Sequence, residues 1–211
     1  MAIAVACLSA GVSAQAATTL IDEGFESFAA LSGAGWVLVN ASTPIGSTSL
    51  TGGDSGIFSA QAGSAGSYVS GNYNNAAAGG TISSWLITPT FATDTDVSIS
   101  FYARADLFAP YFDQISYGIS SGSSSIAAFS VGPAVTLGGD WTQYTLGIAA
   151  QGAGTVARFA IAYVGNADDA NFIGIDTLTV NAVPEPSTWL MFGAGLAGLA
   201  GLARRRLPAQ G

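Results

Sequence analysis

Four acidic residues are the side chains best suited to chemistry in this sequence, and they fall near the two ends of its central region. They are Asp22, Glu23, Glu26 and Asp176. Carboxylates that crowd together repel one another unless a hard cation bridges them, and calcium takes about six to eight oxygen ligands from such groups. If the strands that carry these residues pair, we expect a structural calcium site. The alternative is a hydrated acidic edge.

A second candidate site lies in the middle of the chain, where residues 106–113 are predicted to form a long loop. Loops on a rigid scaffold commonly carry binding residues. We predict that Tyr111 and Phe112 expose aromatic rings there, on which a sugar stacks, and that Arg104 holds a polar ligand. The alternative for Arg104 is a surface ion pair with Asp106.

The remaining aromatic and acidic candidates have simpler interpretations. Trp36, Trp85 and Trp141 occur at strand starts, where a large aromatic ring fills a sandwich core, so packing is favoured over sugar stacking. Asp168 and Asp169 lie in a polar loop and could add a calcium ligand, although an acidic pair in a loop is usually just hydrated.

Catalysis has little support in the residue types. The chain has no histidine, which removes the Ser-His-Asp and Cys-His nucleophiles and the commonest zinc ligand. A glycoside hydrolase needs two carboxylates whose pKa values are pushed apart, and no spacing singles out such a pair here. We therefore predict a protein that is not an enzyme, with a carboxylate-dependent, glycan-active enzyme as the less favoured alternative.

Composition indicates an exported β-rich domain. The 211 residues include 28 glycines, and 49% are hydrophobic whereas only 9% are charged. This chain is too apolar and too aromatic to be disordered. Residues 17–183 hold two arginines and twelve acidic residues, a net charge of −10. Such a surface repels nucleic acid and favours divalent cations.

Short apolar runs separated by Gly, Ser, Asn and Asp clusters predict an all-β domain with two packed sheets. Apolar and polar residues alternate over 97–101 and 159–163, which is typical of strands with one buried face. Turn residues dominate 72–80, 120–125 and 166–171. For residues 72–75 a tight turn is favoured, with a ligand loop as the alternative. The predicted strands are 19–25, 36–40, 67–70, 81–87, 97–103, 114–120, 126–130, 142–149, 157–164 and 172–180.

The N-terminal residues 1–16 are predicted to be a secretory signal peptide. They contain an apolar stretch followed by Ala14-Gln15-Ala16, an Ala-x-Ala site that predicts cleavage before Ala17. The basic region that normally opens such a signal is missing. We therefore expect the true start of the protein to lie upstream of Met1.

The C-terminal segment combines a proline-containing motif, a short apolar run that predicts a helix, and a cluster of arginines. Pro184 and Pro186 cannot continue a helix and hold the chain around Glu185 extended. The apolar run that follows is roughly 22 Å long as a helix, against a hydrocarbon core of roughly 30 Å, so it predicts a marginal single transmembrane helix over 188–203. Three arginines then place its C-terminal end in the cytoplasm. They are Arg204, Arg205 and Arg206.

This tail resembles the PEP-CTERM sorting signal of exopolysaccharide-producing Gram-negative bacteria, in which Pro-Glu-Pro, a hydrophobic helix and a basic cluster meet a membrane transpeptidase, exosortase. The family's motif maps onto Pro184, Glu185 and Pro186, and the signal as a whole onto residues 182–208. The resemblance implies cleavage close to this motif by an exosortase-type transpeptidase. It also implies transient anchoring in the inner membrane, followed by release to the cell envelope or extracellular matrix.

The intervening residues 17–181 resemble the choice-of-anchor J domain, which is related to the cleaved-adhesin and MAM jelly rolls. The resemblance rests on the motifs at 21–26, 85–89 and 172–176, which occur in the family's order. It implies a jelly-roll-like β-sandwich used for surface adhesion or for contact with an exopolysaccharide or surface glycan. Related jelly rolls commonly hold a metal, and Glu26 and Asp176 match that position best. A structural spacer in the biofilm matrix is the alternative function.

Overall fold

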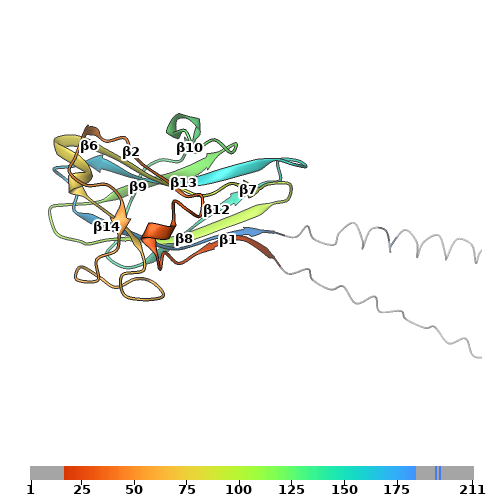
Figure 1. The fold of residues 1–211 in the computed structure, drawn as a ribbon, viewed down its shortest axis with the longest axis horizontal. Helices are drawn as coiled ribbons and strands as arrows, with labels where there is room; N and C mark the ends of the chain where they lie inside the picture. Colours follow the sequence, from red (N-terminus) through yellow and green to blue (C-terminus); the bar gives the residue numbers. More distant parts are fainter. Residues whose placement is uncertain (1–16, 184–192, 194, 196–211) are drawn as a thin grey trace, which may run out of the picture. The chain divides into compact units, whose positions relative to one another are not determined.

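The computed structural model describes residues 17–183, together with residues 193 and 195. Thr18–Val183 form one compact unit. It consists of two antiparallel sheets, one of six strands and one of eight, whose buried faces enclose a core (Figure 1). This confirms the all-β, two-sheet sandwich predicted from the alternation of apolar residues.

The six-stranded sheet is organised around its last strand, β14. Its order is β12-β8-β14-β5-β4, and β1 also pairs with β14. β8 lies on one side of β14, while β5 and β1 pair with the first and second parts of the other side. The strands are β1 (Thr18–Glu23), β4 (Thr51–Gly52), β5 (Val69–Asn72), β8 (Val97–Ala105), β12 (Thr142–Ile148) and β14 (Phe172–Ala182).

The eight-stranded sheet has the order β10-β9-β13-β6-β2, with β11 on β9, β3 on β6 and β7 on β13. The long strands β6 (Ala76–Ile87) and β13 (Val156–Asn166) form its centre. The others are β2 (Val37–Asn40), β3 (Thr43–Ile45), β7 (Phe91–Ala92), β9 (Gln114–Ser120), β10 (Ser130–Val131) and β11 (Val135–Thr136). Three short 3-10 helices lie in the connections: η1 (Phe28–Ala30), η2 (Tyr73–Asn75) and η3 (Ile126–Ala128).

Alternating residues of the two sheets build the core between them. Ile99 and Phe101 of β8 are fully buried, and so are Phe159 and Ile161 of β13. The rings of Phe101 and Phe159 lie 5.7 Å apart between centroids. Because side chains on a strand alternate between faces, this packing sends the intervening residues of each strand outward.

Both sheets also bury part of their outer faces. On the eight-stranded sheet, Trp85 packs with residues that include Ile126 and Phe129. On the six-stranded sheet, residues 53–68 contribute Phe58 and Tyr68, which form a separate cluster with Phe172 and Trp141 (orange segment in Figure 1). The packing role predicted for the three tryptophans is confirmed for Trp36 and Trp85, which are buried, and Trp141 is half-buried.

Nine of the ten predicted strands overlap observed strands, and two local predictions are wrong. Residues 126–130 begin as the helix η3. A 3-10 turn places residues three apart on one side, so Ile126 and Phe129 both pack against the cluster that contains Trp85. The turn predicted over 72–80 ends early, since β6 begins at Ala76.

The terminal predictions fall mostly outside the described residues. These are the signal peptide over residues 1–16, the motif at Pro184 to Pro186, the membrane helix over 188–203 apart from its helical positions 193 and 195, and Arg204 to Arg206. In the part of the chain that the structure describes, no helix combines the length and apolar character needed to cross a membrane.

Candidate functional site

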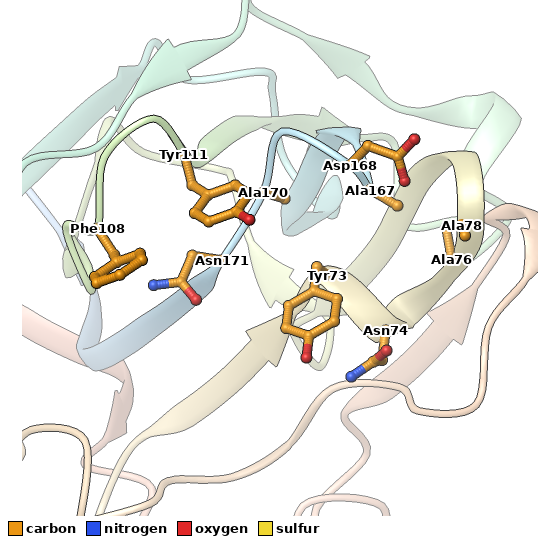
Figure 2. Close-up of a pocket in the computed structure, with 10 residues that line it drawn as sticks. All are labelled: Tyr73, Asn74, Ala76, Ala78, Phe108, Tyr111, Ala167, Asp168, Ala170 and Asn171. Carbon is orange, nitrogen blue, oxygen red and sulfur yellow. The ribbon is translucent and has the colours of Figure 1, made fainter.

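A pocket opens between three loops at the end of the sandwich where β14 begins (Figure 2). Its volume is about 520 Å³, within the range of about 300 to 1,000 Å³ that is usual for ligand sites. Tyr73 and Asn74 come from η2, Phe108 and Tyr111 from the β8–β9 loop, and Asp168 and Asn171 from the β13–β14 loop. Alanines 76, 78, 167 and 170 complete the wall.

Three aromatic rings border this pocket without being buried. Phe108 is 66% exposed, Tyr73 47% and Tyr111 39%. The rings of Phe108 and Tyr111 are nearly parallel, with an interplanar angle of 17° and centroids 6.2 Å apart. Large aromatic side chains are normally buried, and several exposed ones around a hollow mark a binding site.

The pocket wall also carries polar atoms that remain available. Asp168 uses one carboxylate oxygen, Oδ1, to accept the Gly79 N–H at 2.8 Å, and Asn171 uses its Nδ2 to donate to the Asp106 carbonyl at 2.8 Å. The second oxygen of Asp168 and the Oδ1 of Asn171 have no hydrogen-bond donor among the described residues. The wall therefore offers acceptors beside aromatic faces, and none of its ten residues is basic.

Backbone hydrogen bonds tie the three loops into one rigid rim. The Tyr73 N–H donates to the Asn171 carbonyl at 3.0 Å, and the Phe112 N–H donates to the Asp169 carbonyl at 2.8 Å. Asn72 and Asn75 cap η2 with their side chains. A preformed rim lowers the entropy that a ligand must remove on binding.

Asp113 anchors this rim to the core. It is 1% exposed, and its Oδ1 accepts hydrogen bonds from the Tyr163 hydroxyl and the Asn171 N–H. Burial raises the pKa of Asp113, with its hydrogen bonds opposing the shift, and burial also raises the pKa of Tyr163. One buried carboxylate thus joins the β8–β9 loop, the start of β14 and the centre of β13.

The predicted acidic edge is only partly assembled. The first and last strands pair as expected, with Asp22 opposite Thr179 and Glu23 opposite Leu178. The Glu23 carboxylate accepts the Phe25 N–H at 2.8 Å, and Asp22 is exposed. Among the described residues, no three or more acidic side chains form a group able to hold a metal.

Glu26 and Asp176 nevertheless meet at the same short segment. Asp176 is fully buried, and its Oδ2 accepts the N–H groups of Gln61 at 2.7 Å and Ala62 at 3.1 Å. Glu26 lies against the next residue, since a Cβ added to Gly63 would fall 2.5 Å from its Oε1. Burial is the main cause of the raised pKa of Asp176.

Strained backbone flanks both carboxylates. Phe25 has φ of 55° and Thr177 has φ of 48°, and these are the two non-glycine residues with positive φ in the described part of the chain. Such conformations persist where the surroundings enforce them, and they cluster at functional sites. The Thr177 N–H donates to Asp176 Oδ1 at 2.6 Å, so the bulge that breaks the β14 ladder also presents this carboxylate.

The residues predicted to bind a ligand separate into different places. Tyr111 lines the pocket, whereas Phe112 is exposed but does not line it. Arg104 lies beyond the pocket wall on the outer face of the six-stranded sheet, with its guanidinium carbon 4.2 Å from the Phe58 ring centroid. The Asp106 carboxylate accepts from Asn171, and no hydrogen bond with Arg104 is present.

Residues 182–206 match the PEP-CTERM protein-sorting motif. The chain carries this sorting motif. It implies an exported protein that is sorted to the cell surface, and the predicted Pro184, Glu185 and Pro186 lie inside the matched segment.

Solved structures with the fold of residues 17–183 include two cleaved-adhesin domains of Lys-gingipain from Porphyromonas gingivalis W83. The K3 domain aligns with a TM-score of 0.60 and 18% identity over 79% of this chain and 99% of that domain. The K1 domain aligns with a TM-score of 0.61 and 20% identity over 78% of this chain and 98% of that domain. No curated protein matches the sequence. The predicted likeness to cleaved adhesins is thus confirmed for the fold.

Most of the residues that line the pocket were not predicted as binding residues from the sequence. Tyr73 lies in residues 72–75, for which the sequence favours a tight turn over a ligand loop, and Phe108 lies in the predicted loop without being singled out there. For Asp168, the sequence favours a hydrated loop position over a calcium ligand. The available signal was that Tyr73, Phe108 and Asn171 all lie at or just beyond strand ends, where loops gather on one side of a sandwich.

We expect Asp113→Asn to change how stability depends on pH. A carboxyl group whose pKa is raised by folding contributes stability below its unfolded pKa of 3.8, and loses it as pH rises through the folded pKa. The Tm of wild type minus that of Asp113→Asn should therefore be higher at pH 4 than at pH 7. Asp94→Asn, at an exposed position without a hydrogen bond among the described residues, is the control. Parallel Tm profiles for wild type and Asp113→Asn would contradict this prediction.

Proposed function

We propose that this protein is an exported, non-catalytic adhesion module that binds a neutral glycan in the pocket between η2, the β8–β9 loop and the β13–β14 loop. The observation that carries the proposal is the set of three exposed aromatic rings around free carboxylate and amide oxygens. Aromatic faces carry partial negative charge that attracts the C–H edges of a sugar ring, and acceptors bind its hydroxyls.

Charge favours a neutral sugar for this pocket. Asp168 lies in the wall and no basic residue is among its ten lining residues. An anionic sugar would therefore meet repulsion from Asp168 without a compensating cation. A neutral ring, by contrast, can use the free oxygen of Asp168 as a hydrogen-bond acceptor.

The pocket is tested by removing its rings one at a time. Tyr73→Ala and Tyr111→Ala should each weaken binding of an oligosaccharide by about tenfold. Each removes a ring on which the sugar stacks, and tenfold corresponds to about 1.4 kcal/mol of binding free energy. Ligands come from a panel of neutral glucose, galactose, mannose and xylose oligosaccharides, and affinity is measured by calorimetry. Phe112→Ala, a comparably exposed ring outside the pocket, should leave the affinity unchanged. Equal affinities for all variants would rule out this pocket.

The sorting motif supports a second element of the proposal, transient anchoring in the inner membrane and processing by an exosortase-type transpeptidase. Pro184 and Pro186 cannot continue a helix, and proline biases the residue before it towards an extended conformation. β14 ends at Ala182, so the segment follows the folded domain directly. The product is the β-sandwich, delivered to the envelope or extracellular matrix.

Mass spectrometry of the mature protein tests this processing. Material recovered from outside the cytoplasm should lack Arg204, Arg205 and Arg206, because cleavage close to Pro184–Pro186 removes everything beyond it. In a strain without the transpeptidase, the same arginines should remain. Finding the arginines on extracellular protein from the normal strain would contradict the proposal.

We also propose that Glu26 and Asp176 hold a structural calcium ion. The observations that favour it are that both side chains meet residues 61–63, and that each is next to a residue with positive φ, Phe25 or Thr177. Calcium prefers oxygen ligands such as carboxylates and backbone carbonyls. Asp176 Oδ2 already accepts two N–H groups, so Oδ1, which accepts the Thr177 N–H, is the oxygen with a lone pair for the ion. Two carboxylates require carbonyls and water to complete the coordination.

Calcium should raise the Tm of wild-type protein, because an ion that binds only the folded state stabilises it by about 2.7 kcal/mol at about 100 times its Kd. Glu26→Gln should remove most of the increase. The control is Asp22→Asn, a substitution on the exposed side of β1, which should retain it. The same Tm in excess calcium and after chelation would contradict the calcium site.

A further inference from the structure

Arg104 differs from the other arginine of the domain in having no polar partner. The Arg158 guanidinium donates to the carbonyl oxygens of Thr88 at 2.6 Å, Gly122 at 3.1 Å and Gly35 at 3.3 Å. No hydrogen bond from Arg104 to a described residue is present, and its Nε is the one buried side-chain polar atom in the described part of the chain without a partner. Buried polar groups are normally hydrogen-bonded, so this exception requires an explanation.

The aromatic surroundings hold this cation in a fixed position. Ala103 and Ala105 are fully buried in the core, so Arg104 projects from the opposite face of β8. Its guanidinium carbon lies 4.2 Å from the centroid of Phe58 and 5.9 Å from that of Trp141. A guanidinium over aromatic faces stays planar and oriented, and it loses little further freedom when it binds an anion.

Glycine at position 174 makes the arrangement possible. Gly174 lies directly across from Arg104 on β14. A Cβ there would fall 2.7 Å from Cη2 of Trp141 and 2.8 Å from Cε2 of Phe58. The backbone therefore leaves room for the two rings to close around the arginine, on the outer face of the sheet.

Arg104 as a whole is half-buried, and only its Nε is both enclosed and unpartnered. The Nη end accordingly keeps its donors for a molecule from solution. Two parallel N–H groups match a carboxylate in a bidentate geometry, and the low-polarity ring environment strengthens that contact.

We propose that Arg104, framed by Phe58 and Trp141, binds the carboxylate of an acidic sugar, a uronic acid residue. The site is separate from the pocket for a neutral sugar, because Gly174 is three residues beyond Asn171, about 10 Å along the strand. A chain with both neutral and acidic sugars could span the two positions. The Arg104 site is independent of the proposal that the pocket binds a neutral sugar.

Side-chain NMR observes the site directly in the full chain. The five arginines of the sequence give few Nε–Hε signals, and that of Arg104 is the one lost in Arg104→Gln. Oligomers of galacturonate, glucuronate and mannuronate are titrated, each beside its carboxyl-reduced, neutral counterpart. At least one uronate should shift the Arg104 signal while the Arg158 signal stays in place. If no uronate shifts the Arg104 signal, the proposal is wrong.

Affinities then separate this site from the neutral pocket. Wild type should bind the uronate that shifts the Arg104 signal about tenfold more tightly than its carboxyl-reduced counterpart. A difference of this size is expected for a charge-assisted hydrogen bond. Arg104→Gln should abolish that preference. Arg104→Lys should retain part of it, because lysine keeps the positive charge but lacks the two parallel N–H donors of the guanidinium. An Arg104→Gln variant that keeps the full preference would overturn the proposal.

Tyr73→Ala serves as the matched control for the pocket. It should leave the preference for the uronate intact even where it weakens binding of the neutral oligosaccharide. Loss of the preference in this variant would overturn the separate Arg104 site. Sodium acetate is the second control: if acetate shifts the Arg104 signal as strongly as the uronate at equal concentration, the sugar ring adds nothing and the assignment to an acidic sugar fails.

Discussion

The antiparallel pairing of β14 with β8 is the constraint on which the rest of the structure depends. This ladder joins the last strand of the domain to a strand that begins 75 residues earlier, and it fixes the register of both faces. Its inner side places Ile173 and Ile175 in the core. Its outer side sets Gly174 across from Arg104 and places Asp176 where its carboxylate accepts the N–H groups of Gln61 and Ala62. A shift of one residue would exchange these two faces.

The segment that covers the outer face depends on that register. Residues 53–68 have little regular structure, so their position rests on side-chain contacts. Phe58 packs on Phe172 and Trp141, and Asp176 accepts two of the segment's N–H groups. The Trp141 Nε1–H also donates to the Ser59 carbonyl at 3.0 Å. These contacts enclose Arg104 and bring Glu26 and Asp176 to the same segment, residues 61–63, although residues 53–68 contain no strand.

The sequence was sufficient to predict the sandwich because its evidence is periodic. Alternation over 97–101 and 159–163 marks buried and exposed faces, and these two segments are the strands β8 and β13. The pairing of β1 with β14 was expected from the jelly-roll resemblance, because the first and last strands of that fold pair. Periodicity could not identify η3 as a helix, because the contact of Ile126 and Phe129 with Trp85 joins segments about 40 residues apart.

The sites were harder to predict, for the same physical reason. Tyr111 was identified because its loop is long and aromatic, but Tyr73 and Asn171 reach the same pocket through the pairing of β5 with β14. Arg104 was expected beside Asp106, holding a polar ligand or forming a surface ion pair, and its guanidinium instead lies over Phe58. Phe58 belongs to a segment whose path has no signature in the sequence. Residue types therefore indicated the chemistry, while the long-range register decided which residues share a site.

The position of the pocket fits the way in which the chain is sorted. Thr18 and Ala182 are paired, so the two ends of the domain lie together at one end of the six-stranded sheet (Figure 1). Asn171 precedes the first residue of β14, and the 11 residues of that strand span about 36 Å. The pocket therefore lies at the opposite end of β14 from Val183, where the chain continues into the sorting motif. Binding residues at that distance from the point of attachment need not be disturbed when the motif is held or cut.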